Sequence, residues 1–359
     1  MKNVVLFAML ALFTGRSTAL VNPRPTTNFR SIIRTKNSRP SEMFETSNPY
    51  LQTTRLSRTK LYLEMCRIDN LPASFIFVAG GAVAATHRLG DVLSPSVLLA
   101  ALCTVLITAT SMVVNDYFDF RVGTDEGDEG NVLARKALLP AQAKYFAART
   151  YGALMFLICL APFASVRVIL MSGTISTFLY TKYLKPVTWM KNVSVASVCA
   201  FAPAVGGICA CGGLGSLFTS SGGHCLGLSA ALFFGIMHRE ILMDVVDVKA
   251  DKVSGIITIP VKYGAHFASK VAVLLACAMG GVCLSMGRQP WGRWVGLLGA
   301  SRMTFNAWAV TKVAKKTVHQ GSLGSDMNGG IESGDLSRKC SVAIEESKLT
   351  FPAVLFSFL

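Results

Sequence analysis

Long apolar stretches alternate with short polar connections along most of the chain. An α-helix needs about 20 apolar residues to cross the hydrocarbon core of a bilayer, and each stretch comes close to that length. Eight stretches predict membrane-spanning helices: 71–88, 95–114, 150–166, 167–184, 193–213, 226–243, 266–286 and 291–314. A ninth stretch, 349–359, is only about half a span long. The pattern predicts an all-α membrane protein, a bundle of eight or nine transmembrane helices.

The composition agrees with a membrane-embedded fold. Hydrophobic residues make up 52% of the chain and charged residues 15%, whereas about a quarter of the residues in an average soluble domain are charged. The net charge of +15 comes partly from the first sixty residues and otherwise mainly from loops, where basic side chains attract anionic lipid head groups. We expect membrane lipid, and no nucleic acid, as a partner. The polar, Gly- and Ser-rich segment 315–348 predicts an exposed loop.

The N-terminal region has the composition of a targeting sequence. Lys2 precedes the apolar run 4–13, and small residues follow before position 20, which predicts a secretory signal peptide over 1–20. Residues 21–60 carry eight Lys or Arg against two Glu, which is typical of a transit peptide. This order resembles the bipartite presequence of plastid proteins in algae with secondary plastids. It predicts a plastid membrane location, with an endomembrane destination as the alternative, and leaves 61–359 as the folded domain.

Two clusters of aspartates stand at the ends of the second and sixth predicted helices. Helical residues three and four positions apart share a face, so each cluster presents a patch of carboxylates. The carboxylates within such a patch repel one another unless a cation lies between them. Mg²⁺ prefers a few carboxylates together with phosphate oxygens of a substrate. The clusters therefore indicate diphosphate chemistry at a membrane; they are Asn115-Asp116-x-x-Asp119 with Asp125, and Asp244-x-x-Asp247-x-x-x-Asp251.

Other interpretations of these clusters are less favourable. A single aspartate pair can cap a helix or face solvent, but two clusters at matching helix ends are harder to explain in that way. Carboxylates at a membrane edge are costly unless they are paired or bind a metal. A transporter, the alternative from another class, would spread its acidic residues through the depth of the spans. Here they gather at two helix ends beside Lys and Arg, which favours an enzyme.

The cysteines do not indicate a metal site. Most of the ten fall within apolar stretches, where Cys behaves as a small hydrophobic residue. Cys209 and Cys211 with His224 and Cys225 form the one cluster that suggests zinc, but their spacing lacks a known zinc pattern.

Five motifs in the region 62–359 resemble, in the same order, those of UbiA-type intramembrane prenyltransferases. The two aspartate clusters are two of them, the second being followed by the segment 255–264. The others are Arg67-x-x-Asn70, Tyr180-x-x-Tyr183-Leu184-Lys185 with Asn192-x-x-Val195-Ala196, and Arg239-Glu240.

The resemblance implies a helical bundle around a central cavity, in which an isoprenoid chain passes from a prenyl diphosphate to a small hydrophobic or aromatic acceptor. It implies Mg²⁺ as the cofactor, which makes the diphosphate a better leaving group. The metal ligands that it implies are Asp116, Asp119, Asp125, Asp244, Asp247 and Asp251. The catalytic residues are Asp116, Asp119, Asp244, Asp247 and Lys185. The substrate-binding residues are Arg67, Asn70, Asn115, Arg135, Tyr180, Asn192 and Arg239.

Two side chains of this set have alternative interpretations, and two positions depart from the family's pattern. Lys185 could be a snorkelling residue at a helix end, and Arg67 could contact a lipid head group. The first motif has Gly123 where the family places a third aspartate, and Asp125 takes that role here. Arg135 stands where the family often has an Arg-Pro pair.

The acceptor predicted from the sequence is an aromatic quinone or tocopherol precursor. A UbiA-like terpene cyclase is the alternative within the family, because it would use the same metal and diphosphate site but capture the cation internally. The base that takes the acceptor's proton is not identified by the sequence.

Overall fold

The computed structural model describes residues 55–123, 130–321 and 329–359, and all regular structure within them is helical. The predicted signal peptide, most of the predicted transit segment and Asp125 lie outside the described residues. The helices are α2 (Arg55–Met65), η2 (Ile68–Asn70), α3 (Leu71–Thr86), η3 (Leu89–Leu93), α4 (Pro95–Val122), α5 (Pro140–Leu160), α6 (Ala164–Leu179), η4 (Tyr180–Leu184), α7 (Met190–Cys211), η5 (Leu214–Phe218), α8 (Ser220–Val253), α9 (Ile259–Tyr263), α10 (Ala265–Met286), α11 (Pro290–Gly321) and α12 (Gly329–Phe358).

Several of these helices can cross a membrane by their length and apolar character. Within the described part of the chain, five segments qualify: Ile68–Thr86, Pro95–Arg121, Met190–Cys211, Gly222–Val253 and Ala265–Met286. The apolar helix α6 is shorter. The prediction of an all-α protein with several membrane spans is therefore confirmed. The number of eight or nine spans and the central cavity stay predictions.

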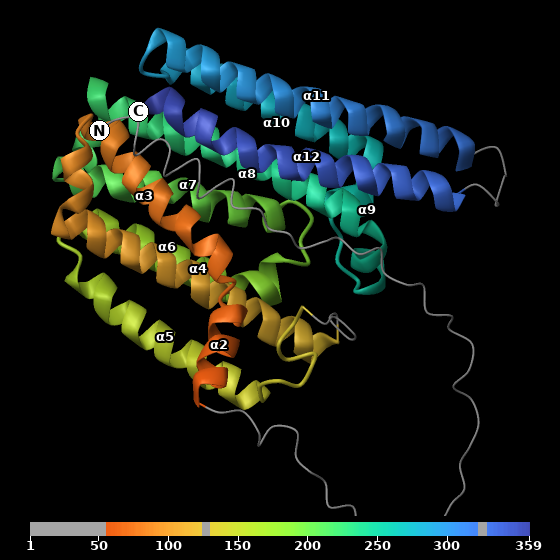
Figure 1. The fold of residues 1–359 in the computed structure, drawn as a ribbon, viewed down its shortest axis with the longest axis horizontal. Helices are drawn as coiled ribbons and strands as arrows, with labels where there is room; N and C mark the ends of the chain where they lie inside the picture. The colour runs from red at the N-terminus through yellow and green to blue at the C-terminus, as the bar shows by residue number, and fades with distance from the viewer. Residues whose placement is uncertain (1–54, 124–129, 322–328) are drawn as a thin grey trace, which may run out of the picture.

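Helix α8 lies at the centre of the bundle and packs against α3, α7, α10 and α12. Helices α10, α11 and α12 stack along one side of it, whereas α4, α5 and α6 lie on the other side (Figure 1). Helices α4 and α8 run in the same direction, so their C-terminal ends lie at the same end of the bundle, near α9 (Figure 1). The two aspartate clusters occupy these C-terminal ends.

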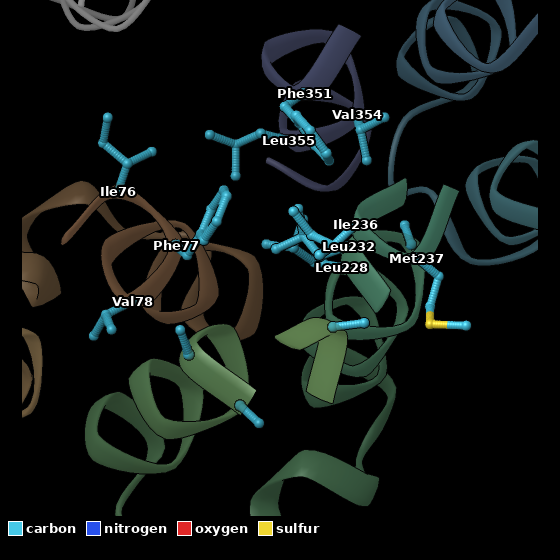
Figure 2. Packing of buried hydrophobic residues seen from close by; sticks show 14 of the residues in the cluster. Ile76, Phe77, Val78, Leu228, Leu232, Ile236, Met237, Phe351, Val354 and Leu355 are labelled. Atoms are coloured by element: carbon cyan, nitrogen blue, oxygen red, sulfur yellow. The ribbon is translucent and has the colours of Figure 1, made fainter. Parts of the chain in front are cut away.

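The core joins α3, α8 and α12. Figure 2 shows side chains of all three helices meeting there. Phe77 of α3 faces α12, and Leu232 of α8 lies below Phe351 of α12 in this view. The rings of Phe77 and Phe351 meet edge to face with their centroids 6.5 Å apart, the arrangement that the aromatic quadrupole favours. This contact secures α12 to the helices that carry the site.

Helices α3 and α7 cross at two glycines, which have no side chain to keep the two backbones apart. A Cβ atom on Gly81 would overlap the backbone of Pro203, and one on Gly206 would overlap the carbonyl of Val78. Without side chains at these positions the two backbones can touch, which is a common device in membrane helix pairs. Since α7 carries part of the site, this close crossing fixes its position.

For residues 315–321 and 329–348 the prediction of an exposed loop is wrong, and residues 322–328 of the predicted loop lie outside the described residues. Helix α11 continues to Gly321, and α12 already begins at Gly329. The buried residues of this part of α12, Cys340, Ala343 and Ser347, are spaced three and four positions apart, so they form one helical face. The small side chains of that face pack against neighbouring helices, while charged residues such as Asp335, Arg338 and Lys339 are exposed.

A second, smaller core lies at the end of the bundle that carries the first aspartate cluster. It combines Met65 and Cys66 with Val113 of α4 and with Leu133 and Leu138 of the connection before α5. Burial, with a smaller contribution from the Asp116 carboxylate, raises the pKa of the Cys66 thiol to about 11. The connection 131–138 is thus packed onto the protein beside this cluster.

Candidate active site

The first cluster lies in the last two turns of α4. Asn115 donates from its Nδ2 to Oδ2 of Asp119 at 2.7 Å, one helical turn further on. Lys185 donates from Nζ to both carboxylate oxygens of Asp119, at 2.6 and 2.9 Å. Asp119 is therefore held by a neutral donor from its own helix and by a charged donor from the connection between α6 and α7.

Asp116 is paired with a cation from the segment that precedes α3. Its Oδ1 accepts a hydrogen bond from the guanidinium of Arg67 at 3.0 Å. The side chain of Arg67 is 52% exposed and that of Asp116 only 6%. Arg67 has a φ of 49°, a left-handed conformation that non-glycine residues seldom adopt. The backbone thus turns sharply at Arg67, where a solvent-facing cation reaches a buried carboxylate.

A π-helical turn, η4, positions Lys185. The N–H of Lys185 donates to the carbonyl of Tyr180 at 2.7 Å, five residues earlier instead of four. In a regular α-helix these two residues would point about 140° apart. Widening the turn brings them closer to one face, and π turns often occur at functional sites. Tyr180 and Lys185, both predicted from the sequence, consequently approach the same carboxylates.

The second cluster lies near the C-terminal end of α8, and its most buried member is Asp244. Oδ1 of Asp244 accepts from Nζ of Lys191 at 2.5 Å, and Oδ2 accepts from Nδ2 of Asn192 at 2.9 Å. Both donors belong to the first turn of α7. Asn192 was predicted to bind substrate, whereas Lys191 was not predicted at all. The sequence signal for Lys191 is its place directly before Asn192.

The other two aspartates of this cluster differ in burial. Asp247 is exposed, whereas Asp251 is buried. Among the described residues, Oδ2 of Asp251 and Oδ1 of Asn192 are buried oxygens with no hydrogen-bond partner. Buried polar atoms without partners are rare and need an explanation. Two such oxygens beside a buried carboxylate make a donor set that fits a hard cation such as Mg²⁺.

The cations of the protein itself occupy the carboxylates in this conformation. Within the described part of the chain, no group of three His, Cys, Asp or Glu side chains is arranged to hold a metal. Asp116, Asp119 and Asp244 are instead neutralised by Arg67, Lys185 and a third cation, Lys191. The residue types fit Mg²⁺, and a bound metal would compete with these cations for the carboxylates.

Tyr180 connects the two clusters. It is half-buried and lies within electrostatic range of Asp119 on α4 and of Asp244 and Asp251 on α8. Glu240 lies one helical turn before Asp244 and pairs with Arg239 at 3.0 Å. It is also within electrostatic range of Tyr180. The clusters from α4 and α8 thus share one polar region.

Two predicted residues, Arg135 and Asn70, make other contacts. Arg135 pairs with Glu64 of α2 at 2.6 Å, which attaches the connection before α5 to α2. Asn70 is exposed at the N-cap of α3. Their roles in substrate binding stay predictions.

Comparison with known proteins identifies the class. The sequence model of the UbiA prenyltransferase family matches residues 74–320. The match covers more than half of the chain, so the chain belongs to this family and is a membrane prenyltransferase.

Similar proteins include several archaeal enzymes. Digeranylgeranylglyceryl phosphate synthase of Thermococcus sibiricus is 28% identical over 223 residues, 61% of this chain and 74% of that protein. A solved structure of a digeranylgeranylglyceryl phosphate synthase matches with a TM-score of 0.57 at 18% identity, covering 83% of this chain and 99% of that one. A solved structure of a UbiA homolog from Archaeoglobus fulgidus bound to GPP and Mg²⁺ matches with a TM-score of 0.53 at 17% identity. The match covers 79% of this chain and 99% of that one. At these identities the two solved structures support the fold alone.

Proposed function

We propose that the protein transfers an isoprenoid chain from a prenyl diphosphate to an acceptor within the membrane. The observation that carries this proposal is that α4 and α8 bring two carboxylate clusters to the same end of the bundle (Figure 1), where Lys185 binds Asp119 and Lys191 binds Asp244. An arrangement of carboxylates and cations at a membrane edge suits a diphosphate whose hydrocarbon tail extends into the apolar bundle.

The residues divide between metal and phosphate binding. Bound Mg²⁺ would neutralise the diphosphate and so improve it as a leaving group. Asp116, Asp119, Asp244, Asp247 and Asp251 would hold the metal, as would Asp125, which lies outside the described residues. Lys185 supplies a positive charge to the phosphate oxygens and, while no substrate is bound, neutralises Asp119.

The polar groups around the clusters keep the ligands in place. Asn115 and Asn192 donate to Asp119 and Asp244, which orients these carboxylates. Arg67 holds Asp116 from the solvent side. Burial of the carboxylates limits water near the reacting carbon, which protects an allylic cation from being quenched.

For the acceptor we propose an electron-rich aromatic ring of a quinone or tocopherol precursor. The spacing of Asn115, Asp116, Asp119 and Asp125 in this chain resembles that of family members in quinone pathways. We propose a plastid membrane as the location, because of the composition of residues 1–60.

A glycerol phosphate lipid is the second candidate acceptor. The observation in its favour is the name shared by relatives at 27–30% identity, digeranylgeranylglyceryl phosphate synthase. Such an acceptor would offer a hydroxyl group in place of an aromatic ring.

An acceptor panel tests the function and separates the candidates. Purified protein is incubated with Mg²⁺, geranylgeranyl or phytyl diphosphate, and either aromatic precursors or a glycerol phosphate lipid, and the lipid extract is measured by mass spectrometry. A prenylated acceptor that disappears with EDTA supports the transferase and names its acceptor. A cyclised hydrocarbon would indicate a terpene cyclase instead, and no consumption of prenyl diphosphate would favour a transporter.

A further inference from the structure

Lys191 is a buried cation that no predicted role accounts for. Its side chain is 12% exposed, and that of its partner Asp244 is 2% exposed. The ammonium also lies within electrostatic range of Asp251 and Glu240. A lysine that snorkels to a lipid head group would extend its Nζ outward, whereas this one points at the second cluster.

Lys191 repeats the arrangement of Lys185. Lys185 directly follows η4, and Lys191 lies six positions later in the first turn of α7. Each lysine binds a buried aspartate of one cluster. Lys185 binds Asp119 on α4, and Lys191 binds Asp244 on α8. One segment thus supplies a cation to each side of the site.

Stability alone does not account for a buried ion pair of this kind. The loss of hydration of two buried charges often cancels their attraction, so an apolar pair would stabilise the fold as well. The pair also leaves two oxygens beside it without partners, Oδ1 of Asn192 and Oδ2 of Asp251.

We propose that Lys191 is a second diphosphate-binding lysine, held by Asp244 until substrate arrives. This inference rests on the proposed function. In the substrate-free protein the ammonium neutralises Asp244. When Asp244 takes up the metal, the ammonium is released from it and binds a phosphate oxygen of the substrate. Lys185 and Lys191 then contact the diphosphate from the sides of α4 and α8.

The proposal predicts opposite changes in two affinities. In Lys191→Gln, the amide keeps a hydrogen-bond donor near Asp244 but removes the competing charge. Titration calorimetry on the full purified protein should show tighter binding of Mg²⁺ alone and weaker binding of inorganic diphosphate in the presence of Mg²⁺. Each change should be about tenfold or more, the size expected for one hydrogen bond to a charged group. Lys270→Gln, which removes an exposed charge from α10, is the matched control.

Other outcomes contradict the proposal. If both affinities in Lys191→Gln equal those of Lys270→Gln, Lys191 is only a structural counter-ion. If both affinities fall together, the substitution has disrupted the site as a whole, and the proposal also fails.

A measurement on the unmodified protein covers the case in which Lys191→Gln does not fold. Acylation of the Lys191 amine, followed by peptide mass spectrometry, should increase when Mg²⁺ alone is added and fall again with inorganic diphosphate. Unchanged labelling of Lys191 would overturn the proposal. If the proposed function itself fails, the result is distinct from failure of the Lys191 proposal. The unmodified protein would then bind no diphosphate and consume no prenyl diphosphate.

Discussion

At the scale of single residues, the aspartates of the site differ in burial, and therefore in whether their removal leaves a buried charge without a partner. Asp244 is buried and neutralises Lys191, whereas Asp247 lies exposed one helical turn further along α8. Loss of a buried partner leaves an uncompensated charge, which costs about 3–5 kcal/mol. Loss of an exposed carboxylate has little effect on folding.

Asp244→Ala and Asp247→Ala should therefore separate catalysis from stability. Both variants should lose turnover by about 100-fold or more, because each removes a charge aimed at the reacting groups. Only Asp244→Ala should also unfold at a clearly lower temperature in detergent. Turnover and thermal unfolding are measured on the same preparations. Normal turnover in Asp247→Ala would remove this residue from the proposed site.

The sequence was most informative where residue type and spacing together imply chemistry. The aspartate clusters stood out because carboxylates at helix ends near a membrane are unusual, whereas Lys185 and Asn192 were predicted from the resemblance to the UbiA family. Lys191 was missed because a lysine in a polar connection resembles any solvated lysine. Its role depends on the packing of α7 against α8, which sequence spacing does not reveal. Arg135 was predicted from its position alone, and the structure pairs it with Glu64.

At the scale of helices, the crossing of α3 and α7 is the contact on which the site depends most. Gly81 and Gly206 leave no space for a Cβ atom because backbone lies directly opposite. Backbone cannot move aside as a flexible side chain can. Since α7 carries Lys191 and Asn192, separating the two helices would also displace partners of Asp244.

Gly81→Ala and Gly206→Ala should each destabilise the protein by about 1–3 kcal/mol or more, the usual range for overpacking. Gly152→Ala is the matched control, because nothing lies within 4 Å of a Cβ atom at this position on α5. That control should be neutral or more stable by about 0.5–1 kcal/mol. Thermal unfolding in detergent compares the three. Equal stability of all three variants would contradict the close crossing.

The helices themselves were largely predictable, because long apolar stretches have few alternatives in a membrane. Their ends were not. Helices α4 and α8 continue through the aspartate clusters, since the polar residues there remain helical once they are paired. The N-terminal part of α12 was mistaken for a loop because its buried face includes small residues, such as Cys340 and Ala343, that give a weak hydrophobic signal.

At the scale of the whole molecule, the fold brings together two clusters that lie 128 positions apart, from Asp116 to Asp244. Helices α4 and α8 run in the same direction and end on the same side (Figure 1). Lys185, which follows η4, pairs with α4, and Lys191 in the first turn of α7 pairs with α8. The site thus exists only in the assembled bundle, and no single helix contains it.

The release of diphosphate is the most direct test of this account. The measurement compares inorganic diphosphate released from a prenyl diphosphate with prenylated acceptor formed, in the unmodified protein and in Asp119→Asn. We expect one diphosphate for each prenylated product, with both lost in the presence of EDTA and in Asp119→Asn. Undiminished release by folded Asp119→Asn, or no release by the unmodified protein with any prenyl chain length, would contradict a transferase built on the two carboxylate clusters.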